Sequence, residues 1–426
     1  MSDTIFAVSS GAQPAAIAVM RISDPEALPA VERLAGELPL PRRASLRTLR
    51  RDGEPLDRAL VLIFPGPNTA TGEDLAELHL HGGRAVVRAV SDALGALPGL
   101  RPAEAGEFTR RALTHNRIDL TEAEGLADLL AAETDAQRRA AMRFTEGGIR
   151  RLVESWAARA LRLSALVEAQ LDHADEDDVA ASDPRVAAGA AELAHEIDTA
   201  VAQPGVERLR DGIRIVLAGP PNAGKSTLLN ALAGREAAIV SQIAGTTRDR
   251  IEAPVTRNGQ AYLLIDTAGL HERPSDAVEA IGIDRARQSL VDADLVLWLD
   301  DVAPPAEAGG KRLWINARCD LPGRIGSEGR ISVSARTGAG LEALWAAIER
   351  LSADLLPLPD AIALNARQRN LAGRAATHLI AASVEADPLL QAEHLRGALR
   401  QFDRITGAAD VEAMLDALFG QFCIGK

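Results

Sequence analysis

The pattern of apolar and polar residues changes several times along the 426-residue chain. Near the amino terminus, short apolar runs alternate with glycine-containing turns, and a helical pattern follows them. The runs lie at residues 4–10, 15–23, 58–64 and 75–83, and the helical pattern at 84–97. Such alternation predicts a small α+β domain, which we place at residues 1–119.

From residue 120 onward, apolar residues recur at helical spacing among many alanines, which is typical of long helices packed on one another. The acidic segment 172–184 interrupts this pattern. It favours an exposed connection between two helices, with a metal site as the alternative. We expect the first part of a helical domain at residues 120–209.

The pattern changes again near Gly212, where strand-like runs begin to alternate with helical segments. The strands are expected at 213–219, 261–269, 293–300, 312–316 and 331–335. Alternating strands and helices predict a mostly parallel α/β sheet, here at residues 210–355. After a proline-marked linker at 355–361 the alanine-rich helical pattern returns, so the α/β domain is inserted into a helical domain that resumes at 356–426.

Composition narrows the class of protein. A chain of 426 residues, 47% of them hydrophobic, is long enough for roughly two to four domains. Its 2 cysteines cannot form a disulfide framework, which is typical of a reducing compartment. We see neither a leader peptide nor an apolar run that could cross a bilayer, and we expect a cytoplasmic protein.

The net charge of −13 argues against a surface that coats nucleic acid nonspecifically, because phosphate contacts need clustered Lys and Arg. It leaves open an RNA that is bound by a local patch or through a partner.

Residues 219–226 read GPPNAGKS and follow a predicted strand. This is the complete G-x-x-x-x-G-K-S pattern in the strand-loop-helix setting that it requires. Its glycines let backbone N–H groups converge on phosphate, while Lys225 neutralises the β and γ charges and Ser226 offers a hydroxyl to magnesium. We expect nucleotide contacts from Asn222, Ala223, Gly224, Lys225, Ser226 and Thr227.

Two downstream segments indicate a GTPase. Asp266 follows a predicted strand and can lie near the metal, and Gly269 can donate its N–H to the γ-phosphate. The loop containing Thr247 can place that residue on magnesium. This order resembles the translation-factor-like GTPases. The further contacts expected are Ser241, Gln242, Ile243, Ala244, Gly245, Thr246, Thr247, Asp266, Thr267, Ala268 and Gly269.

The base-recognition pattern N-K-x-D reads Ala317-Arg318-Cys319-Asp320 in this chain. Asp320 can accept hydrogen bonds from the guanine amine and imide. Ala317 cannot make the asparagine contact, and whether Asn316 does so is left open. We expect guanine selectivity with weakened affinity, and we assign Ser334, Ala335 and Arg336 to the last element of the base site.

The residue that orients the attacking water is not evident from the core motifs. Leu270 stands where Ras-like enzymes carry a glutamine, and it cannot hydrogen-bond to water. Glutamates within 271–286 are candidates for this role.

Three segments outside the nucleotide motifs carry a more specific resemblance. Residues 67–83 (PNTATGEDLAELHLHGG), 101–130 and 422–426 (FCIGK) are similar to the tRNA modification GTPases of the MnmE (TrmE) family, and the similarity spans essentially the whole chain. It implies a folate-binding N-terminal domain, a helical domain in two segments, and an inserted Ras-like P-loop GTPase domain.

The resemblance also implies a function. Family members modify the wobble uridine of certain tRNAs, installing an aminomethyl or carboxymethylaminomethyl group at the 5-position. They use GTP hydrolysis and a tetrahydrofolate one-carbon donor in the 5-formyl or methylene form. The implied partners are a second copy bound through the N-terminal domain, tRNA, and the FAD-containing flavoprotein MnmG (GidA) in a heterotetramer.

Specific residues take on roles through the same resemblance. Potassium replaces the arginine finger and is held by Asn222, Ser241, Ile243 and Thr246, with magnesium on Ser226 and Thr247. Glu279 positions the attacking water, so the catalytic set becomes Glu279, Lys225, Asn222 and Cys423. Folate binding falls to Arg21, Glu77, Arg117 and Lys426, although Arg21 or Glu77 alone would be typical of ordinary surface charges.

The resemblance places the FCIGK segment against the folate pocket across the dimer, with Cys423 as a reactive thiol. From the residues alone, a prenylation box or a frayed tail remains an alternative. For the whole chain, a ribosome-assembly GTPase and a signalling switch are the alternatives to a modification enzyme.

Overall fold

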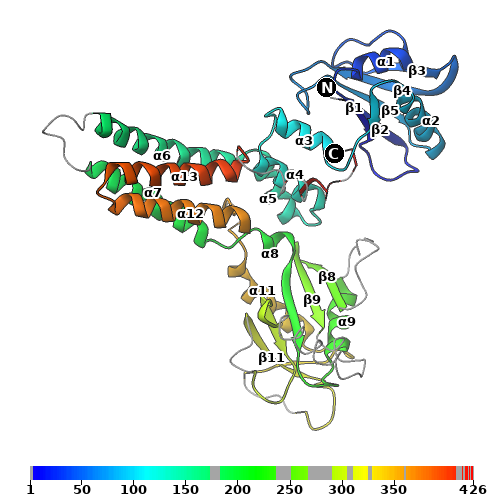
Figure 1. Cartoon of the computed structure of the whole chain (residues 1–426). Coiled ribbons are helices and arrows are strands. Elements are labelled where there is room, and N and C mark those ends of the chain that lie inside the picture. Colours follow the sequence, from blue (N-terminus) through cyan, green and yellow to red (C-terminus); the bar gives the residue numbers. More distant parts are fainter. Residues whose placement is uncertain are drawn as a thin grey trace, which may run out of the picture. The chain divides into compact units, whose positions relative to one another are not determined.

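The computed structural model describes residues 3–172, 183–236, 251–266, 290–304, 310–324, 329–358, 361–408, 415, 418–420, 422 and 424–425. Packing contacts divide the chain into two units. The first contains residues 1–127, 144–157 and 400–426, and the second contains residues 128–143 and 158–399. Each unit therefore combines segments that lie far apart in the sequence (Figure 1).

A mixed sheet with the strand order β3-β4-β5-β2-β1-β6 forms the centre of the first unit. Strand β6 pairs with β1 in parallel and the other pairs are antiparallel. The strands are β1 (Thr4–Val8), β2 (Ile17–Ser23), β3 (Ser45–Arg51), β4 (Glu54–Phe64), β5 (Leu75–His81) and β6 (Leu100–Pro102).

One face of this sheet is covered by α1 (Ala27–Ala35) and α2 (Arg84–Gly95), whose apolar sides share a core with it. Alternate residues of a strand point to opposite faces. Met20 and Leu78 therefore point into this core, whereas Arg21 and Glu77 point to the other face.

Helical segments and the carboxyl-terminal residues complete the first unit. These segments are α3 (Glu107–Thr114), most of α4 (Leu120–Ala131) and the start of α6 (Gly148–Asp172), whereas α5 (Asp135–Thr145) and the rest of α6 belong almost entirely to the second unit. Trp156 of α6 and Phe402 of α13 (Pro388–Thr406) are fully buried, with ring centroids 6.1 Å apart. Ser9 next to β1 donates a hydrogen bond from Oγ to the Gly425 carbonyl oxygen at 2.8 Å.

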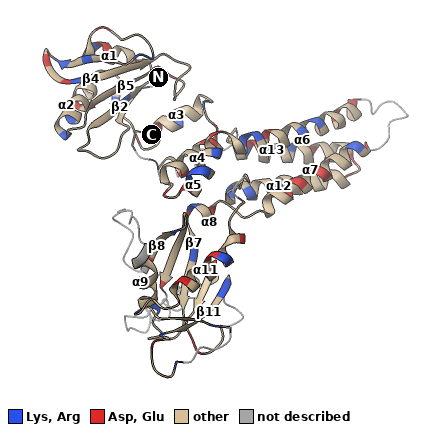
Figure 2. Cartoon of the chain, turned by 180° about the vertical axis from the view of Figure 1, so that it is seen from behind, with Lys and Arg blue, Asp and Glu red and all other residues tan. Residues whose placement is uncertain are grey.

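The second unit contains a bundle in which α7 (Pro184–Ala202) packs along α12 (Ala366–Val384). Asp183 caps α7 by accepting a hydrogen bond from the Arg185 N–H, and Asn365 forms a capping box with Gln368 at the start of α12. Charged residues are distributed along these helices, in keeping with their amphipathic pattern (Figure 2). The predicted helix break is confirmed, since α6 ends at Asp172 and α7 begins at Pro184.

A second sheet, also in the second unit, has the strand order β12-β11-β10-β7-β9-β8. All its described pairs are parallel except β8 with β9. The strands are β7 (Ile213–Ala218), β8 (Ile251–Arg257), β9 (Gln260–Asp266), β10 (Leu295–Trp298), β11 (Lys311–Ala317) and β12 (Ile331–Val333). The associated helical elements are α8 (Glu207–Arg210), α9 (Lys225–Glu236), α11 (Leu341–Ser352) and the 3-10 helix η2 (Ala353–Leu355).

The predicted fold class is confirmed: an α+β N-terminal domain, a helical domain and an inserted P-loop domain with a mostly parallel sheet. The sequence analysis did not identify β3 and β8, which are edge strands of their sheets. Strand β3 is rich in arginine and β8 contains Pro254, features that edge strands tolerate but that obscure a strand pattern. The proposed domain boundaries stay a prediction.

Candidate functional site

The loop between β7 and α9, residues 219–224, has the backbone of a phosphate-binding loop. Gly219 has a φ of 146°, and a Cβ there would lie 2.5 Å from the Leu299 carbonyl oxygen. Only glycine fits so close to the neighbouring chain. Asn222 and Gly224 also have left-handed backbone angles, with φ of 62° and 97°. The loop therefore turns sharply into α9, whose first N–H groups have no partner within the helix and can bind an anion.

Lys225, the first residue of α9, lies beneath this loop. Its side chain is buried, and its Nζ donates hydrogen bonds to the carbonyl oxygens of Gly219 and Pro220, each at 2.9 Å. Burial lowers the pKa of Lys225, and the nearby Asp266 partly offsets this effect. A buried ammonium held by neutral carbonyls is stabilised by an added anion, so a phosphate group suits this position.

Ser226 and Asp266 meet beside the loop. Strands β7 and β9 run in parallel with Leu217 opposite Asp266, so both strands end at the same edge of the sheet. Asp266 is 1% exposed and accepts a hydrogen bond from Ser226 Oγ. Hydroxyl and carboxylate oxygens are ligands that Mg²⁺ prefers. Across the described parts of the chain, no group of three or more His, Cys, Asp or Glu side chains is arranged to hold a metal.

A cavity of about 360 Å³ adjoins the loop. Asp320 lies in its wall, and Arg336 donates a hydrogen bond from Nε to the Asp320 carboxylate at 3.0 Å. Hydrogen bonds from Ser334 and Arg336 lower the pKa of Asp320, which is therefore ionised at neutral pH and can accept two N–H donors. The lining residues are Gly224, Thr227, Leu228, Ala317, Arg318, Asp320, Leu321, Val333, Ala335 and Arg336.

Asn316, whose part in base recognition the sequence left open, is buried at the end of β11. This residue is 3% exposed and donates a hydrogen bond from Nδ2 to Ser332 Oγ on β12 at 3.1 Å. It is not among the described residues that line the cavity, and its amide is bonded to the neighbouring strand. Ala317 lines the wall instead.

Arg318 is a cavity residue that the sequence analysis did not assign. Its φ is 58°, and its side chain lies against the phosphate loop, where a Cβ on Gly224 would come within 3.3 Å of Arg318 Nε. The signal in the sequence was its place in the N-K-x-D pattern, where lysine is usual. Cys319, its neighbour, is partly buried and has a free thiol, in keeping with a small filler.

Several predicted site residues lie outside the described part of the chain. They are Ser241, Gln242, Ile243, Ala244, Gly245, Thr246, Thr247, Thr267, Ala268, Gly269, Glu279, Cys423 and Lys426.

Two predicted folate residues, Arg21 and Glu77, lie opposite each other on β2 and β5. Arg21 donates to Glu77 Oε1 from Nη2 at 3.0 Å and from Nε at 3.3 Å, and its guanidinium lies 5.8 Å from the Phe108 ring. His79 lies 3.3 Å from the other carboxylate oxygen of Glu77. The result is a partly exposed polar cluster on the face of the sheet that α1 and α2 do not cover.

Arg117, the third residue predicted to bind folate, follows α3. Its backbone N–H donates to the Ala112 carbonyl oxygen at 2.8 Å, and its Nε donates to the Thr69 carbonyl oxygen at 3.2 Å. Thr69 belongs to the loop between β4 and β5, residues 65–74. This loop is therefore in direct contact with a residue predicted to bind folate.

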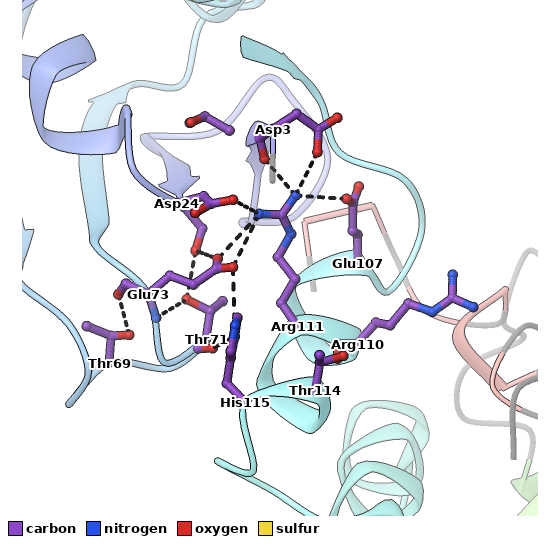
Figure 3. A network of polar contacts seen from close by, with 12 residues as sticks. Asp3, Asp24, Thr69, Thr71, Glu73, Glu107, Arg110, Arg111, Thr114 and His115 are labelled. Atoms are coloured by element: carbon purple, nitrogen blue, oxygen red, sulfur yellow. Dashed lines mark hydrogen bonds and ion pairs between the residues drawn. The ribbon is translucent and has the colours of Figure 1, made fainter. Parts of the chain in front are cut away.

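Arg111 on α3 forms a network that the sequence analysis missed. Figure 3 shows it reaching into a group of carboxylates from Asp3, Asp24, Glu73 and Glu107, while the adjacent Arg110 points away. Each of these residues alone reads as a surface charge in the sequence. In the sequence, the doublet Arg110-Arg111 gives no sign that one arginine is buried.

No described helix combines the length and apolarity needed to cross a membrane.

The chain matches two family models. Residues 4–117 match the GTP-binding protein TrmE N-terminus, and residues 120–423 match the MnmE helical domain. The two models together cover nearly the whole sequence.

Curated proteins give full-length matches. The tRNA modification GTPase MnmE of Rhizorhabdus wittichii is 59% identical over 429 residues, covering 100% of this chain and 97% of that protein. The protein of the same name from Erythrobacter litoralis is 55% identical, with 100% of both chains covered. Among solved structures, the G domain of the T. maritima FeoB iron transporter is 27% identical and covers 33% of this chain and 98% of that one. Its TM-score is 0.25.

Proposed function

Because the chain belongs to the MnmE family of tRNA modification GTPases, we propose that it binds and hydrolyses GTP in the modification of tRNA uridines. The observation that carries this proposal is the buried Lys225 beneath a G-x-x-x-x-G-K-S loop, next to a cavity walled by an ionised Asp320. Lys225 and the backbone of residues 222–227 bind the phosphates, and Asp320 selects guanine.

Magnesium is held by Ser226 and Thr247, with Asp266 beside it, and its charge assists phosphoryl transfer. Potassium is held by Asn222, Ser241, Ile243 and Thr246. A cation there offsets negative charge that develops in the transition state, which is the task of an arginine finger in other GTPases. The left-handed backbone of Asn222 supports this assignment, because it sets this residue at the bend of the phosphate loop. Glu279 orients the attacking water.

The N-terminal domain binds a tetrahydrofolate derivative that supplies the one-carbon unit. Arg21, Glu77, Arg117 and Lys426 form the binding site, and Cys423 is the reactive thiol. The partly exposed Arg21–Glu77 pair supports this role, since a carboxylate and a guanidinium side by side can recognise the donor and acceptor edge of a pterin.

The chain acts as a homodimer through this domain, in the cytoplasm, together with tRNA and the FAD-containing flavoprotein MnmG. Three apolar side chains support dimerisation through the sheet face opposite α1 and α2: Ile17, Leu46 and Leu60 are 56%, 48% and 42% exposed there. Exposed apolar groups on one sheet face are typical of an interaction surface.

We propose the domain limits 1–119 for the folate domain and 210–355 for the GTPase domain. The helical domain is then made of residues 120–209 and 356–426. The second sheet lies inside residues 120–423, the range that matches the helical family model, and this placement supports the division.

The test is GTP hydrolysis by the full chain in potassium or sodium salts of equal ionic strength, with and without MnmG. We expect turnover that is faster in potassium, and modified wobble uridine only when tRNA, MnmG and folate are all present. Equal rates of hydrolysis in both salts would contradict the proposed potassium site. Hydrolysis without any tRNA modification would instead favour a ribosome-assembly or signalling GTPase.

A further inference from the structure

Arg111 is one of the most heavily bonded side chains in the first unit. Its side chain is 13% exposed, and its two terminal nitrogens divide the surrounding carboxylates between them. Nη1 lies 2.9 Å from Asp24 and 3.4 Å from Glu73, and Nη2 lies 3.3 Å from Asp3 and 3.2 Å from Glu107. Nη2 also donates to the Asp3 main-chain oxygen at 2.8 Å. A planar guanidinium fork can serve these acceptors simultaneously, which an ammonium cannot.

Glu73 connects this cluster to the loop of residues 65–74. Its carboxylate, 9% exposed, accepts a hydrogen bond from Ser23 Oγ at 2.8 Å, and Ser23 Oγ lies 2.7 Å from Thr71 Oγ1. The Glu73 main-chain oxygen accepts a hydrogen bond from Thr69 Oγ1 at 2.6 Å. Figure 3 shows the arrangement, with Arg111 on one side of Glu73 and the two threonines on the other. The side chain and the main chain of Glu73 therefore both restrain the conformation of this loop.

The loop in turn packs against the segment that carries Arg117. His115 Nδ1 lies 2.9 Å from the Thr71 carbonyl oxygen, and Thr69 accepts the hydrogen bond from Arg117. Gly72, with a φ of 82°, is so close that a Cβ would lie 2.7 Å from His115 Cβ and 3.3 Å from Arg117 Cγ. Arg117 is thus held at two points, at its backbone by the end of α3 and at its guanidinium by the loop.

We propose that Arg111 is a positioning residue for folate binding, because it fixes the distance between these two points. It does so by binding Glu73 of the loop from within α3 itself. The role rests on the proposed folate site and deepens it. Arg111 does not touch the folate; it sets the direction in which Arg117 presents its charge.

Replacing the Arg111 guanidinium by an ammonium group should loosen the loop while a positive charge stays in the cluster. In Arg111→Lys, a single ammonium cannot contact all the carboxylates that the guanidinium bridged, and Glu73 loses its ion pair with α3. In Glu73→Gln the fork remains but its charged partner on the loop is lost. Both substitutions act at the same contact, so their effects should not add.

The experiment measures binding of 5-formyltetrahydrofolate to the full-length chain by calorimetry, together with amide hydrogen exchange of residues 65–74. We expect about tenfold weaker binding for Arg111→Lys and for Glu73→Gln, and no further loss in the double variant, since a small misplacement of a binding group has effects of this size or larger. Exchange in the loop should accelerate in all three variants. Arg88→Lys is the matched control, because Arg88 is 86% exposed on α2 and pairs only loosely with Asp92, at 4.0 Å.

Normal folate affinity in a folded Arg111→Lys protein, or unchanged exchange in the loop, would overturn the positioning role. If wild-type protein binds no folate, the proposed folate site fails, and the exchange measurement still decides whether Arg111 holds the loop. A circular dichroism spectrum separates these outcomes from misfolding. Should Arg111→Lys fail to fold, Glu73→Gln, which closely matches glutamate in shape, carries the same test.

Discussion

Gly219 offers the sharpest test of how the phosphate loop is built. Replacement by alanine places a methyl group 2.5 Å from the Leu299 carbonyl oxygen and 2.9 Å from the carbonyl carbon. Both distances are shorter than 3.0 Å, the closest approach that a Cβ atom normally makes to another heavy atom. The φ of 146° is itself unfavourable for any residue with a Cβ. Strain of this kind costs about 1–3 kcal/mol.

The strain cannot be relieved without moving the loop. Backbone on both sides of the contact is fixed, since the Leu299 N–H donates to the Ala218 carbonyl oxygen at 2.7 Å. Moving residue 219 away from β10 also shifts one of the two carbonyls that hold Lys225. We therefore expect Gly219→Ala to lower the thermal unfolding midpoint and to weaken GDP binding by about tenfold or more, as 1.4 kcal/mol corresponds to a factor of ten.

Gly234→Ala is the matched control. Gly234 lies in α9, and nothing is within 4 Å of a Cβ there. Alanine should stabilise the helix by about 0.5–1 kcal/mol and leave GDP affinity unchanged. Fluorescence titration with a labelled GDP and a thermal melt decide the matter. Wild-type affinity and melting in Gly219→Ala would refute the argument.

Two further predictions concern the same site. Ala317→Asn should strengthen GDP binding about tenfold, because it restores the asparagine contact with the guanine base that this chain lacks. The same titration measures it. An unchanged affinity would mean that Arg318 or another group already makes that contact. Lys225→Met should abolish GDP binding yet raise the melting temperature of the nucleotide-free protein, because it removes a buried ammonium. Burial lowers the pKa of Lys225 from its ordinary 10.5, so the unfolded chain binds this proton more tightly than the folded chain does. The stability of the wild-type protein should therefore rise with pH between the lowered pKa and 10.5. A melting curve series for Lys225→Met should lack that rise, and an equal rise in both proteins would contradict the assignment.

The parts of the structure that the sequence predicted well are formed by residues close together in the chain. Strand β7, the glycine loop and α9 are consecutive, so their pattern and spacing were enough to place Lys225 beneath the phosphate site. The parallel sheet followed from alternation of strands and helices, and with it the meeting of Ser226 and Asp266 at one edge.

Other features depend on which distant residues the fold brings together. Asn316 faces Ser332 because β11 pairs with β12 in one register, and no local pattern reveals that register. Arg111 meets Asp24 and Glu73, which lie 87 and 38 positions away in the sequence, so its burial is a property of the tertiary structure. Charged residues are usually exposed, and the sequence analysis accordingly gave Arg111 no role.

Gly425 has a consequence for how the protein is made. Its φ of 98° brings it so near Val8 that a side chain would meet the Val8 carbonyl oxygen at 2.3 Å, and Ile424 pairs with Ala105. Ser9 and Gly425 are 416 positions apart along the chain. These contacts therefore form only after the ribosome has synthesised Gly425, and a chain whose translation stops before that residue lacks them.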